Sequence, residues 1–179
     1  MRVIAGSLGG RTLRAPAGTV TRPTSDRVRE AVFDVLGSMV DLAGAAVADL
    51  FAGSGALGIE ALSRGAGSAV FVDQDPGALR ATRENLGALD LADRARVVRD
   101  DVLRYVGRPH RFDLALCDPP YRFAAWDGVL TRLRASVAVL ESGRAVTVPG
   151  GWEVIRNKRY GDTLVTVVRS LGAPEKGTS

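Results

Sequence analysis

The chain of 179 residues has only one cysteine, Cys117, and one histidine, His110. A single cysteine excludes an internal disulfide, and with one histidine it leaves too few soft ligands for a structural zinc site. The sequence also lacks an apolar run near the roughly 20 residues of a membrane span, and residues 1–6 lack the apolar core of a signal peptide. We therefore expect a cytoplasmic protein without a metal, built mainly as one domain.

Acidic side chains are scarce at the N-terminus. Residues 1–30 hold six arginines against Asp26 and Glu30, whereas the rest of the chain carries 18 basic and 18 acidic side chains. The whole net charge of +4 therefore lies at one end of the chain. Because the planar guanidinium of arginine suits phosphates and base edges, we predict that this end contacts RNA or DNA. The predicted contacts are Arg2, Arg11, Arg14, Arg22, Arg27 and Arg29.

The N-terminal residues also have their own structural pattern. Residues 2–5 and 12–15 are short extended candidates joined by a glycine-bearing connection, which predicts a hairpin. After a loop, apolar residues at helical spacing predict a helix over residues 24–39, capped by its first residue, a threonine. One face of this helix is apolar, and we expect the other to carry Arg27 and Arg29. We interpret residues 1–40 as a basic appendage.

From residue 45 onward, short apolar segments alternate with helical ones. This alternation implies right-handed crossovers and a mostly parallel sheet with helices on both faces, an α/β Rossmann-like fold. The last two strands flank Tyr160-Gly161-Asp162 and should be antiparallel. We assign residues 41–172 to this domain and expect 173–179 to be a disordered tail. The seven predicted strands are 45–51, 68–73, 96–99, 112–117, 144–148, 152–159 and 163–169, and the predicted helices are 56–64, 76–88 and 126–140.

A glycine-rich turn joins the first of these strands to its helix. Gly53, Gly55 and Gly58 satisfy the G-x-G-x-x-G spacing of dinucleotide sites, and Asp73 follows 20 residues after Gly53. However, Asp49 precedes the first glycine, and a carboxylate there would repel a pyrophosphate while attracting an ammonium. S-adenosylmethionine carries an ammonium and a sulfonium and no phosphate, so its charge fits this site better than that of NAD.

Other acids also follow predicted strands. Asp73 is placed to accept both ribose hydroxyls, and Asp101 could accept from the adenine amine, although its neighbour Asp100 is a rival and both could instead cap a helix. A parallel sheet gathers its strand ends at one edge, where ligands bind, so these acids together with Asp118 predict a cofactor site. The predicted cofactor-binding residues are Asp49, Phe51, Ala52, Gly53, Ser54, Gly55, Asp73, Gln74, Asp101 and Val102.

The segment Asp118-Pro119-Pro120-Tyr121 directly follows the predicted strand 112–117. Consecutive prolines cannot continue a ladder, so this segment could simply be a turn that ends the strand. Its position beside the other strand-end acids instead suggests a catalytic site, in which all four residues take part.

The chain resembles the class I S-adenosylmethionine-dependent methyltransferases and, more closely, the RsmD family, which methylates the exocyclic N2 of a guanine in bacterial small-subunit ribosomal RNA. The resemblance covers about residues 1–170 and rests on residues 22–30, 49–66 and 118–121. It implies methyl transfer to a guanine of 16S rRNA, either as naked RNA or within the 30S subunit. We expect the enzyme to be a monomer.

For this reaction, we predict that the Asp118 carboxylate and the Pro119 carbonyl accept the two hydrogens of the guanine amine, which directs its lone pair at the methyl group. Tyr121 would stack on the extruded base, and Arg122 and Phe123 would line the path by which the base enters. Arg122 is also a predicted RNA contact.

Two departures from the family pattern and several alternatives remain. The family commonly has glutamate where Asp73 stands, and the predicted strand 144–148 lacks the acid expected near its end. Since D-P-P-Y is shared with other amine methyltransferases, a DNA adenine-N6 methyltransferase is an alternative, as are an NAD-dependent oxidoreductase and a non-catalytic RNA-binding module. We expect His110 in a surface loop and Cys117 in the core. Trp126 and Trp152 could pack or contact substrate.

Overall fold

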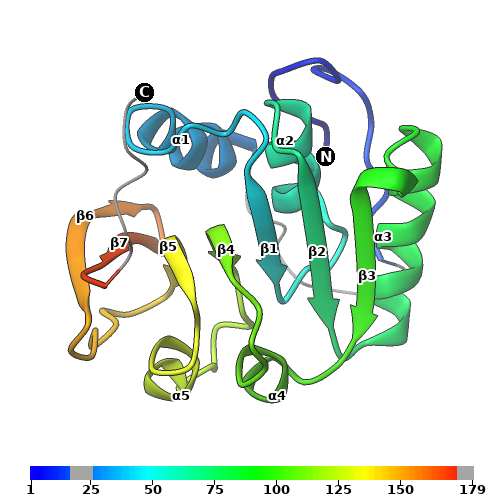
Figure 1. Ribbon diagram of the computed structural model, residues 1–179. Helices are drawn as coiled ribbons and strands as arrows, with labels where there is room; N and C mark the ends of the chain where they lie inside the picture. The colour runs from blue at the N-terminus through cyan, green and yellow to red at the C-terminus, as the bar shows by residue number, and fades with distance from the viewer. Residues whose placement is uncertain (17–25, 173–179) are drawn as a thin grey trace.

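The computed structural model describes residues 1–16 and 26–172, which form a seven-stranded sheet with the order β3-β2-β1-β4-β5-β7-β6 (Figure 1). Strands β1 to β5 pair in parallel, whereas β7 is antiparallel to both β5 and β6. The predicted α/β fold with an antiparallel C-terminal hairpin is therefore confirmed. The strands are β1 (Ala46–Leu50), β2 (Ser68–Asp73), β3 (Ala95–Arg99), β4 (Phe112–Cys117), β5 (Ala135–Ser142), β6 (Trp152–Tyr160) and β7 (Thr163–Ser170).

Helices cover both faces of the sheet, and each face has its own hydrophobic cluster. One cluster joins α1, α2 and α3 to the sheet, and the other joins α4 and α5 to the opposite face (Figure 1). The local sequence determines where α3 begins. Asp75 caps the helix by accepting from the amides of Gly77 and Ala78, and Pro76 lies in the first turn. The helices are α1 (Asp26–Leu36), α2 (Ala56–Ser63), α3 (Pro76–Ala88), α4 (Val102–Val106) and α5 (Trp126–Leu130), with a 3₁₀ turn at Ala92–Arg94.

Two predicted elements are wrong. The helix expected over residues 126–140 ends at Leu130, and residues 135–142 form β5 instead. Residues 144–148, expected as the fifth strand, form no helix or strand. The reason is that β5 lies between β4 and β7 and is buried on both faces, so its nearly continuous apolar sequence has no period-2 alternation to distinguish it from a buried helix.

The N-terminal segment forms the predicted antiparallel pairing. Arg2 bridges Thr12, and the amide of Val3 donates to the carbonyl of Arg11 over 2.9 Å. Val3 and Leu13 are buried in the same cluster that packs α1, α2 and α3 on the sheet. The boundary predicted at residue 40 thus divides one continuous hydrophobic cluster.

The C-terminal end of α1 differs from the prediction, whereas its N-terminal end cannot be compared with it. The helix ends at Leu36 and not at residue 39. The predicted cap Thr24 and most of the loop predicted before it fall within residues 17–25, outside the described part of the chain, as does the predicted tail 173–179. Among residues 1–16 and 26–172, no helix has the length and apolar character needed to cross a membrane.

Candidate active site

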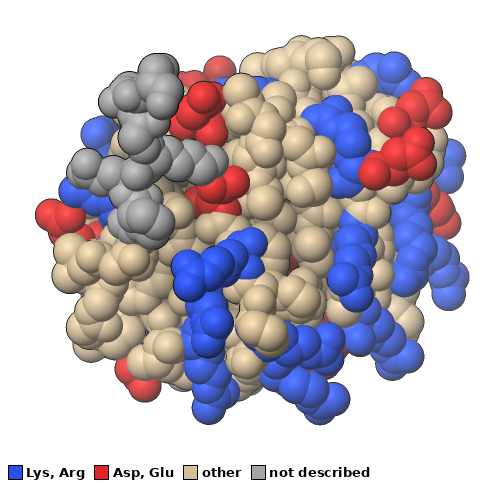
Figure 2. Space-filling view, in the orientation of Figure 1, with Lys and Arg blue, Asp and Glu red and all other residues tan. Residues whose placement is uncertain are grey.

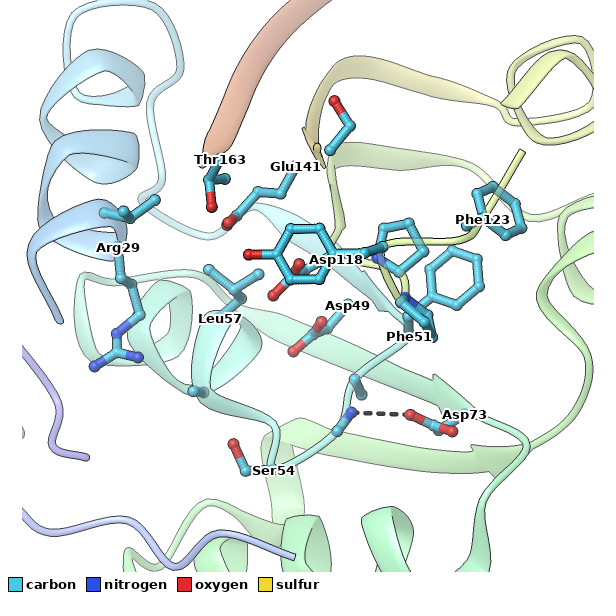
Figure 3. A pocket seen from close by; sticks show the side chains of 18 of the residues that line it. Arg29, Asp49, Phe51, Ser54, Leu57, Asp73, Asp118, Phe123, Glu141 and Thr163 are labelled. Carbon is cyan, nitrogen blue, oxygen red and sulfur yellow. Dashed lines mark hydrogen bonds between the residues drawn. The ribbon is translucent and has the colours of Figure 1, made fainter. Parts of the chain in front are cut away.

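A cavity of about 1480 Å³ lies at the carboxyl ends of β1, β2, β4 and β5. All four residues of the Asp118–Tyr121 segment line it, together with nine of the ten predicted cofactor-binding residues. Figure 3 shows Asp49, Asp73 and Asp118 reaching this space from the carboxyl ends of three different strands, with Asp118 directly after β4. The nine residues are Asp49, Phe51, Ala52, Gly53, Ser54, Asp73, Gln74, Asp101 and Val102.

Two backbone amides of the glycine-rich turn donate hydrogen bonds to carboxylates. Oδ2 of Asp49 accepts from the amide of Gly58 over 2.8 Å, and Oδ2 of Asp73 accepts from the amide of Gly53 over 2.9 Å (Figure 3). In a dinucleotide site such amides would face a phosphate. Because both already face negative charge here, the turn is better suited to a ligand that carries positive charge.

Gly55 is the tenth predicted residue, and it does not line the cavity. It precedes α2 with a positive φ of 77°, and a Cβ atom there would lie 3.0 Å from Cγ2 of Thr82. A Cβ on Gly58 would lie only 2.4 Å from the ring of Phe71. These two glycines therefore shape the turn and let α2 pack closely on the sheet.

Two side chains of α3 donate hydrogen bonds to the backbone of the glycine-rich turn. The hydroxyl of Thr82 donates to the carbonyl of Gly53 over 2.9 Å, and Nδ2 of Asn85 donates to the carbonyl of Ser54 over 2.9 Å. Asn85 also donates to the carbonyl of Arg14 and accepts from its amide. The buried amide side chain of Asn85 thus joins the glycine-rich turn to the N-terminal segment. The sequence does not predict this link, because the glycine motif contains no residue of α3.

Burial strongly affects the acid at the end of β1. Asp49 is 1% exposed, and desolvation raises its pKa well above the ordinary value of 3.8, although the hydrogen bond from Gly58 opposes this shift. The negative charges of Asp118 and Asp73 add to the increase. A cationic ligand beside Asp49 would relieve this electrostatic cost, so the site favours such a ligand.

The acids after β3 have different partners. Asp101 caps α4 by accepting from the amide of Arg104 over 3.1 Å, and its side chain is exposed at the cavity. Asp100 is buried, accepts from the amide of Asp101 and pairs with Arg108. Because Asp100 is buried and paired with Arg108, whereas Asp101 is exposed at the cavity, Asp101 is better placed to reach a ligand.

The segment after β4 forms a turn at the cavity. The carbonyl of Pro120 accepts from the amide of Phe123 over 2.8 Å, and the Phe123 ring makes edge contacts with Phe51 at 5.0 Å and Trp126 at 5.2 Å. Pro119 is buried, whereas Tyr121 is 59% exposed. The aromatic contacts fix the backbone of this turn and leave one flat ring accessible at the surface of the cavity.

Tyr121 also explains the glycine that follows β5. A Cβ atom on Gly143 would lie 3.2 Å from Cδ1 of the Tyr121 ring, so only glycine leaves the ring its full space. The ring therefore lies beside the residue that follows the end of β5.

The fifth strand, β5, carries an acid near its end, Glu141, so the expectation that this strand lacks one is wrong. Cys117 of β4 pairs with Leu140 of β5, so Asp118 and Glu141 follow on neighbouring strands. Glu141 is 2% exposed and lines the cavity. Residues 135–141 are an apolar run that ends in an acid, the same pattern as residues 70–73. The helix predicted over residues 126–140 includes nearly all of this run, so the pattern does not identify Glu141 as a strand-end acid.

Arg29 is not on the exposed face of α1, and its prediction as an RNA contact is wrong. The side chain is fully buried, and its Nη2 donates to Oδ1 of Asp26 over 2.8 Å and to the carbonyl of Arg2. Its Nε lies 4.0 Å from Oε2 of Glu60. Figure 3 shows the guanidinium pointing away from Asp118. Arg29 therefore fastens α1 to the N-terminal segment.

Three other predicted RNA contacts are exposed but have partners within the chain. Arg2 and Arg14 lie 3.7 Å from the carboxylates of Asp26 and Glu84, and Arg11 donates to a backbone carbonyl of α3. The charges of Arg2 and Arg14 are thus partly compensated.

Arg27 is exposed and lines the cavity, and Arg122 is exposed beside Tyr121. Arg22 lies outside the described residues. Basic side chains are not confined to the N-terminal segment, because Figure 2 shows Lys and Arg gathered along the lower margin of one face, where β3, α4 and α5 lie in Figure 1.

The remaining aromatic and sulfur side chains have structural contacts. Trp126 is buried, and the indole N–H of Trp152 donates to the carbonyl of Leu130 over 2.9 Å. His110 is half-buried and stacks on Tyr105 with ring centroids 5.1 Å apart, so it is not a free surface residue. Cys117 is fully buried, and this burial raises the pKa of its thiol well above the ordinary value. In the described part of the chain, no group of three or more His, Cys, Asp and Glu is arranged to hold a metal.

The sheet order and the strand-end site together define a class I methyltransferase. A solved structure of the Escherichia coli protein yhhF, provisionally named a methyltransferase, matches with a TM-score of 0.83 and 32% identity and covers 95% of this chain and 97% of its own. The chain belongs to the family described as conserved hypothetical protein 95, which matches residues 1–169. This membership confirms the resemblance to RsmD-like methyltransferases.

Curated relatives lie in the same group. YlbH of Bacillus subtilis (strain 168), provisionally named an rRNA methyltransferase, is 40% identical over 186 residues, which cover 96% of this chain and all of YlbH. Ribosomal RNA small subunit methyltransferase D of Escherichia coli (strain K12) is 35% identical over 175 residues, which cover 90% of this chain and 85% of the relative.

Proposed function

We propose that the chain transfers a methyl group from S-adenosylmethionine to the exocyclic N2 of a guanine in 16S rRNA. The observation that carries this proposal is the position of the Asp118–Tyr121 segment, which lines the same cavity as Asp49 and Asp73. The relatives named for methylation of ribosomal RNA, at 35% and 40% identity, support the substrate class. The enzyme would act in the cytoplasm as a monomer on 16S rRNA or the 30S subunit.

The acidic lining of the cavity fits the cofactor. S-adenosylmethionine supplies a methyl group on a positively charged sulfur and carries an ammonium but no phosphate. Asp49 would attract the ammonium, Asp73 would accept from the ribose hydroxyls, and Asp101 would accept from the adenine amine. Each of these groups gains from a carboxylate, whereas a pyrophosphate would be repelled.

The residues after β4 would prepare the guanine amine. Its lone pair is delocalised into the ring, so the amine needs orientation before it can attack a methyl group. The Asp118 carboxylate and the Pro119 carbonyl would accept its two hydrogens, and Tyr121 would stack on the extruded base. After transfer the nitrogen loses one proton, for which the Asp118 carboxylate is the adjacent acceptor.

Exposed arginines would hold the RNA around this cavity. Arg27 lines the cavity and Arg122 directly follows Tyr121, and Arg2, Arg11 and Arg14 would extend the basic surface along the N-terminal segment. Binding that depends on such phosphate contacts weakens as salt rises.

Methyl transfer from tritiated cofactor to 30S subunits, 16S rRNA and duplex DNA tests the proposal. Asp118→Ala should lower the rate at saturating substrate by about 10²–10³-fold, the cost of losing one group that stabilises the transition state. S-adenosylhomocysteine, but not NADH, should still raise the melting temperature of this variant. Asp127→Ala, which changes an exposed acid of α5, is the matched control and should stay fully active.

Two outcomes would contradict the proposal. Transfer to duplex DNA and not to rRNA would make the protein a DNA methyltransferase, and full turnover by the Asp118 variant would remove the proposed chemistry. Mass-spectrometric mapping of methylguanosine in rRNA from cells with and without the protein would identify the nucleotide.

A further inference from the structure

The outer strand β6 carries an exposed basic segment. Residues 156–159, Arg-Asn-Lys-Arg, are all exposed, and β6 forms one edge of the sheet. Within the described part of the chain, no carboxylate forms an ion pair with Arg156, Lys158 or Arg159. Among the described residues, these three cations therefore have no paired carboxylate, in contrast to the N-terminal arginines that lie beside acids.

The strand register directs part of this segment toward the cavity. Lys158 of β6 and Glu141 of β5 both pair with Val165, so their side chains lie on the same face of the sheet. Arg156 and Tyr160 follow the same alternation, and the Lys158 ammonium lies 5.1 Å from the centroid of the Tyr160 ring.

The end of this hairpin borders the candidate active site. Lys158, Arg159 and Tyr160 line the same cavity as Asp118 and Tyr121. Figure 3 shows Thr163, the first residue of β7, next to Glu141 and on the side of the cavity away from Ser54 and Asp73. The basic segment therefore lies at the rim, on the side of the cavity formed by β5 and β7.

The distribution of charge between the floor and the rim suggests what this segment binds. The floor holds Asp49, Asp118 and Glu141 and repels phosphate, whereas the rim holds Lys158 and Arg159, which attract it and outnumber the one acid beside them, Asp162. A nucleic acid strand whose base enters the cavity would therefore keep its backbone at the rim. Charged residues also protect edge strands from pairing with other chains, but that role requires no position beside a cavity and no aromatic partner.

We propose that residues 156–160 of β6 form a second RNA-binding surface, which holds the phosphates next to the target nucleotide on the side of the cavity formed by the β6–β7 hairpin. This inference rests on the proposed function. The guanidinium and ammonium groups bind phosphates, and the Tyr160 ring offers a flat surface for a neighbouring base.

The test compares two triple variants that remove equal charge. R156Q/K158Q/R159Q changes the proposed surface, and R111Q/R132Q/R134Q changes three exposed arginines that do not line the cavity. Binding to a 16S rRNA fragment is measured at several salt concentrations. For the first variant, the slope of log K against log salt should become shallower by about two to three, roughly 0.7–0.9 per lost phosphate contact. Its KM for RNA should rise, with kcat at saturating RNA and stabilisation by S-adenosylhomocysteine unchanged. The second variant should match the wild type.

An unchanged slope and KM in the first variant would overturn the inference, as would an equal loss in both variants, which would indicate non-specific attraction. The binding slope is measured without methyl transfer. A wild-type protein that binds rRNA but does not methylate it would therefore refute the proposed function alone, and the slope would still decide whether β6 binds RNA.

Discussion

Glu60 of α2 joins three parts of the chain, and Glu60→Ala should measure how much the fold depends on this junction. Its carboxylate accepts from the amides of Ile4 over 2.7 Å and Ala5 over 3.0 Å, and from Nε of Arg64 over 2.7 Å. It also lies 4.0 Å from Nε of Arg29. Both Glu60 and Arg29 are fully buried, so the substitution would leave two amides without their acceptor and would leave Asp26, 2.8 Å away, as the carboxylate beside Arg29.

Removing one partner of a buried ion pair costs about 3–5 kcal/mol, because the other charge remains desolvated. The two amides of the N-terminal segment would add to this cost, whereas Asp26, which still pairs with Arg29, and water reaching the opened site would recover part of it. We therefore expect a loss of about 4 kcal/mol in the free energy of unfolding. For a chain of this size, such a loss lowers the melting temperature by about 8–16 °C.

Urea unfolding followed by circular dichroism measures this change. Glu30→Ala on the exposed face of α1 is the matched control, and it should change stability by less than about 0.5 kcal/mol. A loss below about 1 kcal/mol in the Glu60 variant, with an unchanged m-value, would refute the reasoning. It would mean that the N-terminal segment is held mainly by its buried apolar residues.

Two further predictions concern the cavity. Asp49→Asn keeps an oxygen for the Gly58 amide but removes a carboxylate whose pKa is raised by burial. The stability that Asp49 contributes is greatest below its ordinary pKa and declines as pH rises through the raised pKa. The urea midpoint of the variant should therefore increase relative to that of the wild type as pH rises. Calorimetry should show at least about tenfold weaker binding of S-adenosylhomocysteine; equal binding would contradict a role for the Asp49 charge. Tyr121→Ala should lower kcat/KM for rRNA by about 10–100-fold, as expected for a lost stacking contact, while Tyr121→Phe should retain activity. Equal losses in both variants would argue against stacking.

The sequence predicted those parts of the site that depend on local pattern. Asp49, Asp73 and Asp118 each follow a short apolar run bounded by turn residues, so both the strand and its terminal acid could be recognised. Glu141 follows the same rule, but no glycine or proline separates β5 from the helix before it. Without that boundary the pattern predicts one helix over residues 126–140, and Glu141 falls in the connection after it.

The sequence could not predict in the same way which Lys and Arg side chains lack a neighbouring carboxylate, because that depends on distance in space and not on position in the chain. Counting along the sequence places all of the excess in residues 1–30, yet Arg29 is buried there and Arg2 and Arg14 lie beside acids. The rest of the chain is neutral in sum, but β6 presents cations whose balancing acids lie elsewhere in the fold. Among these acids are Asp49 and Glu141, which form the floor of the cavity. Folding thus separates a chain of modest net charge into an acidic floor that suits a cationic cofactor and a basic rim that suits RNA.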